Sequence, residues 1–334
     1  MRILRLAVAA LLVLLLVLAG AAGWFFHAMT PRDPAGALRI VEVPRGSTLS
    51  RVGRMLESQG VVRSGRAFEL LGRLEGAAPR LHFGEYELSA AMTPREMLTK
   101  MVEGRVKTWD VTLPEGLSAR EIAGRLVAAG VVEREALDAV LQDPASPARF
   151  GVEGPGLEGY LFPDTYRFPR GLTAVEIVRA LVERFRRSWE PLAPLASAQS
   201  MSQRQVVTLA SIVEKETGQA SERPLVASVF RNRLARGMRL ESDPTVIYGI
   251  AAFDGNLRRV HLEDATNVYN TYQIPALPPG PIASPGEAAL RAVVEPAATG
   301  YLYFVARGDG SHVFSERYDD HVRAVNEHQR RGAR

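Results

Sequence analysis

Residues 202–218 have the sequence SQRQVVTLASIVEKETG, which predicts the helix around which the rest of the chain is built. Ser202 is a good N-cap, and Gln205 three residues later completes a capping-box pattern. Gly218 suits the C′ position that follows a helix. The spacing i, i+3, i+4, i+7 gives the helix one apolar face, made of Val206, Leu209, Ala210 and Val213.

Glu214 is the candidate catalytic residue on this helix. It follows Ala210 by four positions and Val207 by seven, so it projects beside the apolar face, whereas Lys215 and Glu216 point elsewhere. Partial desolvation and the negative end of the helix dipole both disfavour a carboxylate there. A protonated carboxyl is what a general acid near neutral pH requires. The alternative is a solvated glutamate on a surface helix.

The composition indicates a globular body with ordinary surface charge. The chain has 334 residues, of which 46% are hydrophobic and 23% charged, enough for a short segment and two domains. The net charge is +4, and Lys and Arg are spread along the chain, so we do not expect nucleic-acid binding. Cysteine is absent, which excludes disulfides, cysteine nucleophiles and thiolate metal sites.

The N-terminus predicts a membrane anchor. Residues 6–26 are uncharged and apolar, and at 1.5 Å per residue they span about 30 Å, the thickness of a bilayer core. Arg2 and Arg5 precede this run, so the positive-inside rule puts the N-terminus in the cytoplasm and the rest outside. A cleaved signal peptide is the alternative, with residues 19–21 (AGA) as a cleavage site. We expect a single-pass protein of the cytoplasmic membrane with a periplasmic or external body.

Two strand–turn–helix patterns follow the anchor. Residues 28–38 contain Pro and Gly and are expected to form a poorly ordered linker, followed by a small α+β subdomain at 39–110 and a larger mixed α/β domain at 111–334. The subdomain's opening pattern recurs in register 70 residues later. The matching sets are Val41, Pro44, Gly46, Leu56 and Gly60, and Val111, Pro114, Gly116, Leu126 and Gly130. The pattern resembles the start of glycan-binding LysM modules, although a common strand–turn–helix arrangement used twice would look the same.

Several further residues are candidates for a carbohydrate cleft. Residues 156–169 are rich in aromatic and turn-forming residues, which suits either a sugar-stacking cleft wall or the core. Asp243 is either a second active-site carboxyl or an Asx turn before proline. Glu216 and Glu222 are weaker carboxyl candidates than Glu214. Candidates for positioning substrate are Asn232, Asp243, Tyr248, Asn270 and Tyr272.

Six motifs together carry a family resemblance. They are EGYLFPDTY at 158–166, IVEKET at 212–217, ASVFxNRL at 227–234, DPTVxY at 243–248, YNTY at 269–272 and LPPGxI at 277–282. In order and spacing they resemble the YceG-like endolytic murein transglycosylases. The resemblance implies a membrane-anchored lytic transglycosylase that cleaves nascent peptidoglycan strands and limits their elongation, with Glu214 as its acid and base. It also implies work beside peptidoglycan synthases.

The implied chemistry needs one carboxyl and no cofactor or metal. The acid would protonate the glycosidic oxygen between N-acetylmuramic acid and N-acetylglucosamine. The C6 hydroxyl of the muramic residue would then attack its own anomeric carbon and give a 1,6-anhydro end. Two alternatives stay open. One is a muramidase-type hydrolase that pairs Glu214 with Glu222 or Asp243, and the other is a non-catalytic glycan-binding scaffold.

Overall fold

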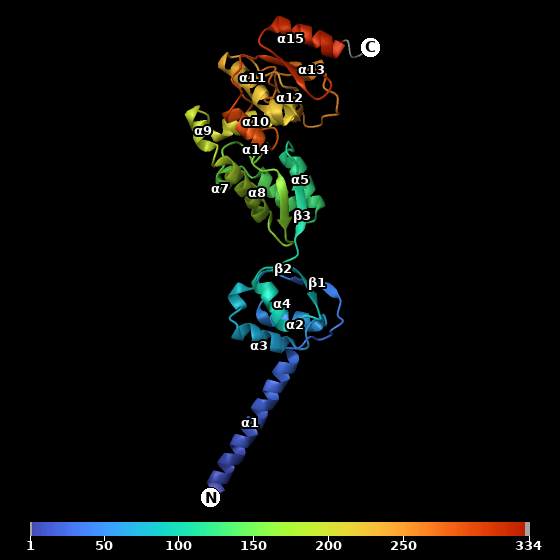
Figure 1. The fold of residues 1–334 in the computed structure, drawn as a ribbon, viewed down its shortest axis with the longest axis vertical. Coiled ribbons are helices and arrows are strands. Elements are labelled where there is room, and N and C mark those ends of the chain that lie inside the picture. Colours follow the sequence, from blue (N-terminus) through green and yellow to red (C-terminus); the bar gives the residue numbers. More distant parts are fainter. Residues whose placement is uncertain (1, 331–334) are drawn as a thin grey trace. The chain divides into compact units, whose positions relative to one another are not determined.

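The computed structural model describes residues 2–330, which form two compact units (Figure 1). The N-terminal unit comprises Met1–Trp109 and Arg167–Gly171, and the C-terminal unit comprises Asp110–Tyr166 and Leu172–Arg334. Helices and small sheets occur in both units, so the α+β class predicted from the sequence is confirmed. Residues 331–334 of the predicted larger domain lie outside the described residues.

The N-terminal unit begins with α1 (Arg2–Ala28), which is long and apolar enough to cross a membrane. The helix has a mean hydropathy of 2.8 over its most apolar window and is not buried inside the protein, so its apolar surface needs another environment. Hydrogen bonds join the following linker to the body of the unit. The N–H of Asp33 donates to the carbonyl of Ala90 at 3.0 Å, and Arg63 donates to the carbonyl of Pro31 at 2.8 Å.

A strand–helix–helix–strand arrangement forms the body of the N-terminal unit. Strand β1 (Leu38–Val43) pairs antiparallel with β2 (Gly84–Ser89), from Leu38 opposite Ser89 to Val43 opposite Gly84. Between them lie α2 (Leu49–Ser58), α3 (Gly65–Leu74) and the short η1 (Ala78–Arg80), and α4 (Pro94–Val102) follows. Gly53 and Gly65 let α2 and α3 approach closely, since a Cβ on either would lie 2.4 Å from the other's carbonyl oxygen.

The repeated sequence pattern produces a repeated backbone arrangement in the C-terminal unit. Strand β3 (Trp109–Leu113) is followed by α5 (Ala119–Ala128), α6 (Arg134–Gln142) and α7 (Ser146–Phe150), and it pairs with β4 (Asp164–Phe168). Gly46 and Gly116 have φ of 75° and 78°, and Gly60 and Gly130 have φ of 72° and 66°. The recurrence of strand, Pro-x-Gly turn, helix and glycine stop is therefore confirmed. The resemblance to LysM modules stays a prediction.

The rest of the C-terminal unit is mainly helical and is built around α10 (Gln203–Glu216), which packs against α11, α12 and α14. Its sheets are two-stranded, β3 with β4 and β5 with β6. The remaining elements are α8 (Ala174–Trp189), α9 (Ala193–Ala198), η2 (Ala220–Glu222), α11 (Arg223–Ala235), α12 (Asp243–Tyr248), α13 (Arg259–Glu263), α14 (Glu287–Val294), β5 (Tyr303–Ala306), β6 (His312–Ser315), α15 (Tyr318–Val325) and η3 (Asn326–Arg330).

Helix α10 confirms the predicted start and corrects the predicted face. The capping box between Ser202 and Gln205 is present. All eight residues from 206 to 213 are buried, so α10 is enclosed on every side and has no single apolar face. The helix ends at Glu216 because Thr217 is extended, with φ of −139°, and Gly218 does not adopt the left-handed conformation expected of it.

The aromatic segment at 156–169 supplies core residues and not a stacking wall. Tyr160 and Phe162 are 0% and 3% exposed. The ring of Tyr160 meets the ring of Phe185 edge to face, with centroids 5.1 Å apart. Of the two interpretations of this segment, the core interpretation holds for these aromatics.

Candidate active site

An open cavity of about 470 Å³ lies beside the C-terminal end of α10, and we call it the acidic cavity. Three carboxylic residues, Glu216, Glu241 and Asp243, lie on its wall, where the end of α10 meets the start of α12. Strands β5 and β6 and helix α15 also contribute lining residues. The other lining residues are Arg233, Leu240, Tyr272, Phe304, Val305, Ala306, His312, His321 and Val325.

Glu216 is the carboxyl in this cavity that is best suited to exchange a proton. Burial of its carboxyl and, to a smaller extent, the nearby charge of Asp243 raise its pKa to about 7. The hydroxyl of Ser242 donates a hydrogen bond to Oε1 and opposes this rise, as do the more distant His312 and Arg233. Glu216 is also the last residue of α10, where the negative end of the helix dipole disfavours a second negative charge. A carboxyl with a pKa of about 7 can both give and take a proton at neutral pH.

Asp243 and Tyr272 line the same cavity and are joined by a hydrogen bond. The hydroxyl of Tyr272 donates to Oδ1 of Asp243 at 2.7 Å, and burial together with this contact raises the pKa of Tyr272. Asp243 is the first residue of α12. The sequence named both residues as substrate-positioning candidates, and they line the cavity that contains Glu216.

Glu214 has a different environment from the one that its position in the sequence predicted. Its side chain is 5% exposed, and Oε1 lies 2.7 Å from a guanidinium nitrogen of Arg223. The N–H of Gly286 donates to Oε2 at 3.0 Å. Arg223 also contacts Glu115 at 3.1 Å, which makes a three-residue ion-pair cluster. Both oxygens of Glu214 thus accept hydrogen bonds from fixed donors, and Glu214 is not among the residues that line the acidic cavity.

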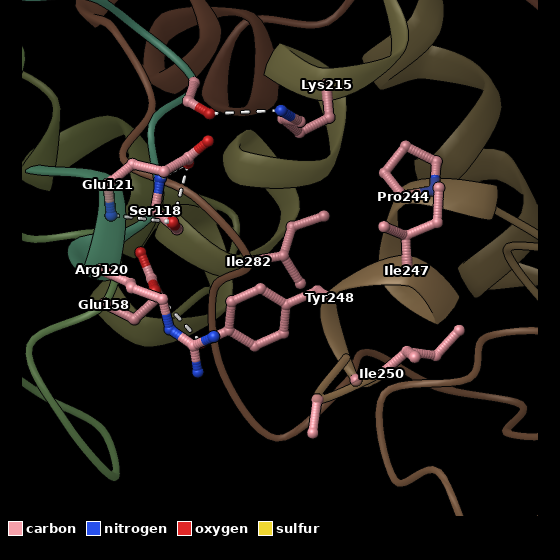
Figure 2. A pocket seen from close by; sticks show the side chains of 13 residues that line it. Ser118, Arg120, Glu121, Glu158, Lys215, Pro244, Ile247, Tyr248, Ile250 and Ile282 are labelled. Atoms are coloured by element: carbon pink, nitrogen blue, oxygen red, sulfur yellow. Dashed lines mark hydrogen bonds between the residues drawn. The ribbon is translucent and has the colours of Figure 1, made fainter. Parts of the chain in front are cut away.

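A second cavity, of about 680 Å³, is lined in part by residues of α10 and α12, and we call it the amphipathic cavity (Figure 2). In Figure 2 the polar side chains of Ser118, Arg120, Glu121 and Glu158 lie along one wall. Aliphatic side chains, among them those of Ile247 and Ile250, lie opposite them. The remaining lining residues are Gly116, Lys215, Pro244, Tyr248, Gly249, Ala251 and Ile282.

Glu158 is the buried carboxyl of the amphipathic cavity. Burial raises its pKa to about 7, although it accepts hydrogen bonds from the N–H of Ala119 at 2.9 Å and the hydroxyl of Tyr248 at 3.1 Å. Tyr248 is thereby fixed in this cavity, and its ring meets that of Tyr269 edge to face. Tyr248 was predicted to position substrate, and the structure separates it from Glu216 and Asp243.

Three other candidates have structural partners. Asn232 donates to the carbonyls of Thr299 and Tyr301 at 2.8 and 2.9 Å. Asn270 is fully buried and donates to three backbone carbonyls between residues 261 and 264. Burial works against ionisation of Glu222, but hydrogen bonds from His312 outweigh it and lower its pKa. Asn232, Asn270 and Glu222 are thus held by hydrogen bonds to other parts of the chain, and none of the three lines the acidic cavity.

The sequence analysis did not identify Glu158 or His312, and it placed Glu216 below Glu214 as a candidate. A signal for Glu158 was present, because it begins the EGYLFPDTY motif. His312 has no local signal, since it lines the cavity with residues that are distant in the sequence.

A helix-rich α+β body with a titratable carboxyl next to a second acid in an open cavity defines a candidate general-acid site. The chain belongs to the YceG-like family, whose family model matches residues 41–327. It is 30% identical to an endolytic murein transglycosylase of Bacillus subtilis, over 85% of this chain and 83% of that protein. It is 29% identical to an endolytic murein transglycosylase of Streptococcus pneumoniae, over 86% of this chain and 58% of that protein.

A crystal structure supports the same relationship at the level of the fold. The structure is that of a yceG-like protein from Listeria monocytogenes, and it superposes on this chain with a TM-score of 0.59 at 32% sequence identity. The match covers 86% of this chain and 98% of the Listeria chain.

Proposed function

We propose that this protein is a lytic transglycosylase that cleaves peptidoglycan strands internally. The names of its Bacillus and Streptococcus relatives support this activity. The observation that carries the proposal is the environment of Glu216. Its carboxyl has a pKa of about 7 and lies in an open cavity that Asp243 also lines. A single acid of this kind is sufficient for a lytic mechanism, because no water molecule has to be activated.

In the proposed reaction, neutral Glu216 gives its proton to the glycosidic oxygen between N-acetylmuramic acid and N-acetylglucosamine. The bond from the anomeric carbon to that oxygen breaks, and its electron pair leaves with the oxygen. The C6 hydroxyl of the same muramic residue forms a new bond to the anomeric carbon and gives its proton to the Glu216 carboxylate. The acid is regenerated and the product is a 1,6-anhydro ring. General acid catalysis of this kind contributes about 10²–10⁴-fold.

Glu216 and Glu214 are the two candidates for this role, and the contacts favour Glu216. The sequence pointed to Glu214, whose two oxygens accept from Arg223 and Gly286. Both oxygens of Glu214 are therefore already occupied by donors from the protein, and Glu214 does not line the acidic cavity. Glu216 has one neutral hydroxyl donor, Ser242, and lies on the wall of the acidic cavity. We therefore assign the acid to Glu216 and a structural role to Glu214.

Asp243 and Tyr272 would act as positioning residues. Their 2.7 Å hydrogen bond fixes a carboxylate beside Glu216, where it helps to keep Glu216 protonated and can accept a hydrogen bond from a sugar hydroxyl or amide. The same pair of carboxyls supports a second candidate function, a muramidase-type hydrolase that uses Glu216 and Asp243. The two functions differ in whether water enters the product.

The N-terminal helix supports membrane attachment of the enzyme. We propose that α1 spans the cytoplasmic membrane with its N-terminus inside and both folded units outside, because Arg2 and Arg5 flank the apolar run. This placement would keep the acidic cavity near newly made strands, and endolytic cutting there would limit strand length. Peptidoglycan synthases are the proposed neighbours, and the glycan-binding role of the N-terminal unit remains a prediction.

The products distinguish these functions. Purified peptidoglycan is digested by the detergent-solubilised protein in water enriched in ¹⁸O, and the fragments are weighed. The lytic reaction predicts fragments lighter by one water, with no ¹⁸O. Reducing ends that carry ¹⁸O would instead establish the hydrolase, and intact glycan would point to a non-catalytic scaffold.

A further inference from the structure

Helices α10 and α12 contribute residues to both the amphipathic cavity and the acidic cavity. On α10, Lys215 lines the amphipathic cavity and Glu216 lines the acidic cavity. On α12, Pro244 lines the amphipathic cavity and Asp243 lines the acidic cavity. Consecutive Cα atoms are about 3.8 Å apart across a trans peptide. At the end of α10 and at the start of α12, neighbouring residues therefore line different cavities. A branched substrate could occupy both cavities at once.

The side chains of the amphipathic cavity do not suit a sugar. Neutral N-acetyl sugars are bound by exposed aromatic faces and by hydrogen-bonding groups, whereas this cavity has one aromatic residue, Tyr248, whose hydroxyl is already bonded to Glu158. Aliphatic groups from Ile247, Ile250 and Ile282 dominate the remaining surface. Such a surface suits small methyl-bearing side chains.

Two cations in this cavity are available to an anionic ligand. Among the described residues, no hydrogen bond or ion pair holds the guanidinium of Arg120, and the ammonium of Lys215 donates to the carbonyl of Gly116 at 3.3 Å. The carboxyls are already engaged. Glu121 accepts from the backbone N–H and hydroxyl of Ser118, at 2.8 and 2.7 Å, and Glu158 accepts from Ala119 and Tyr248. The cavity thus combines methyl-sized apolar surface with two positive charges, on Arg120 and Lys215.

We propose that the amphipathic cavity binds the peptide attached to the N-acetylmuramic residue that reacts in the acidic cavity. This inference rests on the proposed function. The peptide branches from the lactyl group of that sugar, carries free carboxylates and is rich in alanine, so it matches both the charge and the apolar surface. An extended peptide advances about 3.3–3.6 Å per residue, so three residues span roughly 10 Å. A cavity of about 680 Å³ can hold a ligand of that size.

The test compares two substrates and two variants in the full-length protein. One substrate is glycan strands with their peptides, and the other is the same strands after an amidase has removed the peptides. The variants are Lys215→Met and Arg120→Gln, with Arg125→Gln as the control, because Arg125 lies on α5 but does not line the cavity. Steady-state kcat/KM is measured from the anhydro products.

The wild type is expected to prefer strands with peptides. Each cavity variant is expected to lower kcat/KM on those strands about ten-fold, the effect of one lost charge-assisted hydrogen bond, through a higher KM. On stripped strands the variants and the control should match the wild type. Equal losses on both substrates, no loss on either, or a wild type indifferent to the peptide would overturn the inference. Anhydro products from stripped strands would still support the proposed function in each of those cases.

Discussion

Replacing Glu216 by Gln should change the stability of the C-terminal unit in a way that depends on pH. In the folded protein burial raises the pKa of Glu216 from 4.5 to about 7. Between these values the folded protein binds a proton that the unfolded chain releases, so the wild type loses stability as the pH rises. The full effect is about 2.5 pKa units at 1.36 kcal/mol each, or about 3 kcal/mol. Gln has no charge to bury and keeps an oxygen that can accept from Ser242.

The expected result is a difference in unfolding free energy between Glu216→Gln and wild type that grows with pH. It should be constant below pH 4.5, increase in favour of the variant through pH 7, and level off near pH 8 at about 3 kcal/mol above its acid value. The chain has three tryptophans. With Trp24 and Trp109 replaced by Phe, the fluorescence of Trp189 in α8 reports urea unfolding of the C-terminal unit alone.

A control separates this effect from general charge removal. Glu135 is exposed on α6, and Glu135→Gln should give a difference that does not vary between pH 5 and 8. The reasoning about Glu216 is refuted if the difference in unfolding free energy between Glu216→Gln and wild type also does not vary with pH. It is likewise refuted if the variant becomes more stable relative to wild type as the pH falls. Either result would mean that the folded protein does not disfavour the charged carboxyl.

Three further substitutions test the packing around the site. Arg223→Met should cost about 3 kcal/mol, because Glu214 is 5% exposed and would lose its cation, and adding Glu214→Gln should restore part of that loss in urea unfolding. Asn270→Ala removes hydrogen bonds to three carbonyls, so it should cost about 2–3 kcal/mol and speed hydrogen exchange around residues 261–264. Gly159→Ala should lower the melting temperature, because φ at this position is 85° and the new Cβ would lie 2.6 Å from Pro281. Gly156 has open space around it, so Gly156→Ala should leave the melting temperature unchanged.

The sequence was sufficient to predict features that depend on local chemistry. The apolar run that became α1, the capping box at Ser202 and the repeated Pro-x-Gly turn all involve residues within a few positions of one another. Their preferences hold whatever the surrounding fold. The family could likewise be recognised, because its motifs are contiguous stretches.

The choice between Glu214 and Glu216 could not be made from the sequence. Periodicity assumes that a helix has a buried face and a solvated one, but α10 is enclosed on every side from residue 206 to 213. The environment of each glutamate depends on distant residues. Arg223 approaches Glu214 from α11, and Ser242 approaches Glu216 from the turn before α12. Helical spacing carries no information about either contact.

The environments of the substrate-positioning candidates also depend on distant residues, so the sequence could not show which of them line the acidic cavity. Asp243 and Tyr272 are 29 residues apart and meet because the chain returns beside α12. Asn270, two residues before Tyr272, turns inward and binds backbone carbonyls. Polar residues in a motif can thus be part of the site or of its scaffold, and only their partners distinguish the two.

Turnover by two single variants tests the central claim most directly. Purified peptidoglycan is digested by the wild type, Glu216→Gln and Glu214→Gln, at a temperature where circular dichroism shows all three to be folded, and anhydro ends are counted over time. We expect Glu216→Gln to lose at least about 10²-fold in rate, while Glu214→Gln stays within about ten-fold of the wild type. An active Glu216→Gln together with an inactive, folded Glu214→Gln would contradict the assignment of the proton donor.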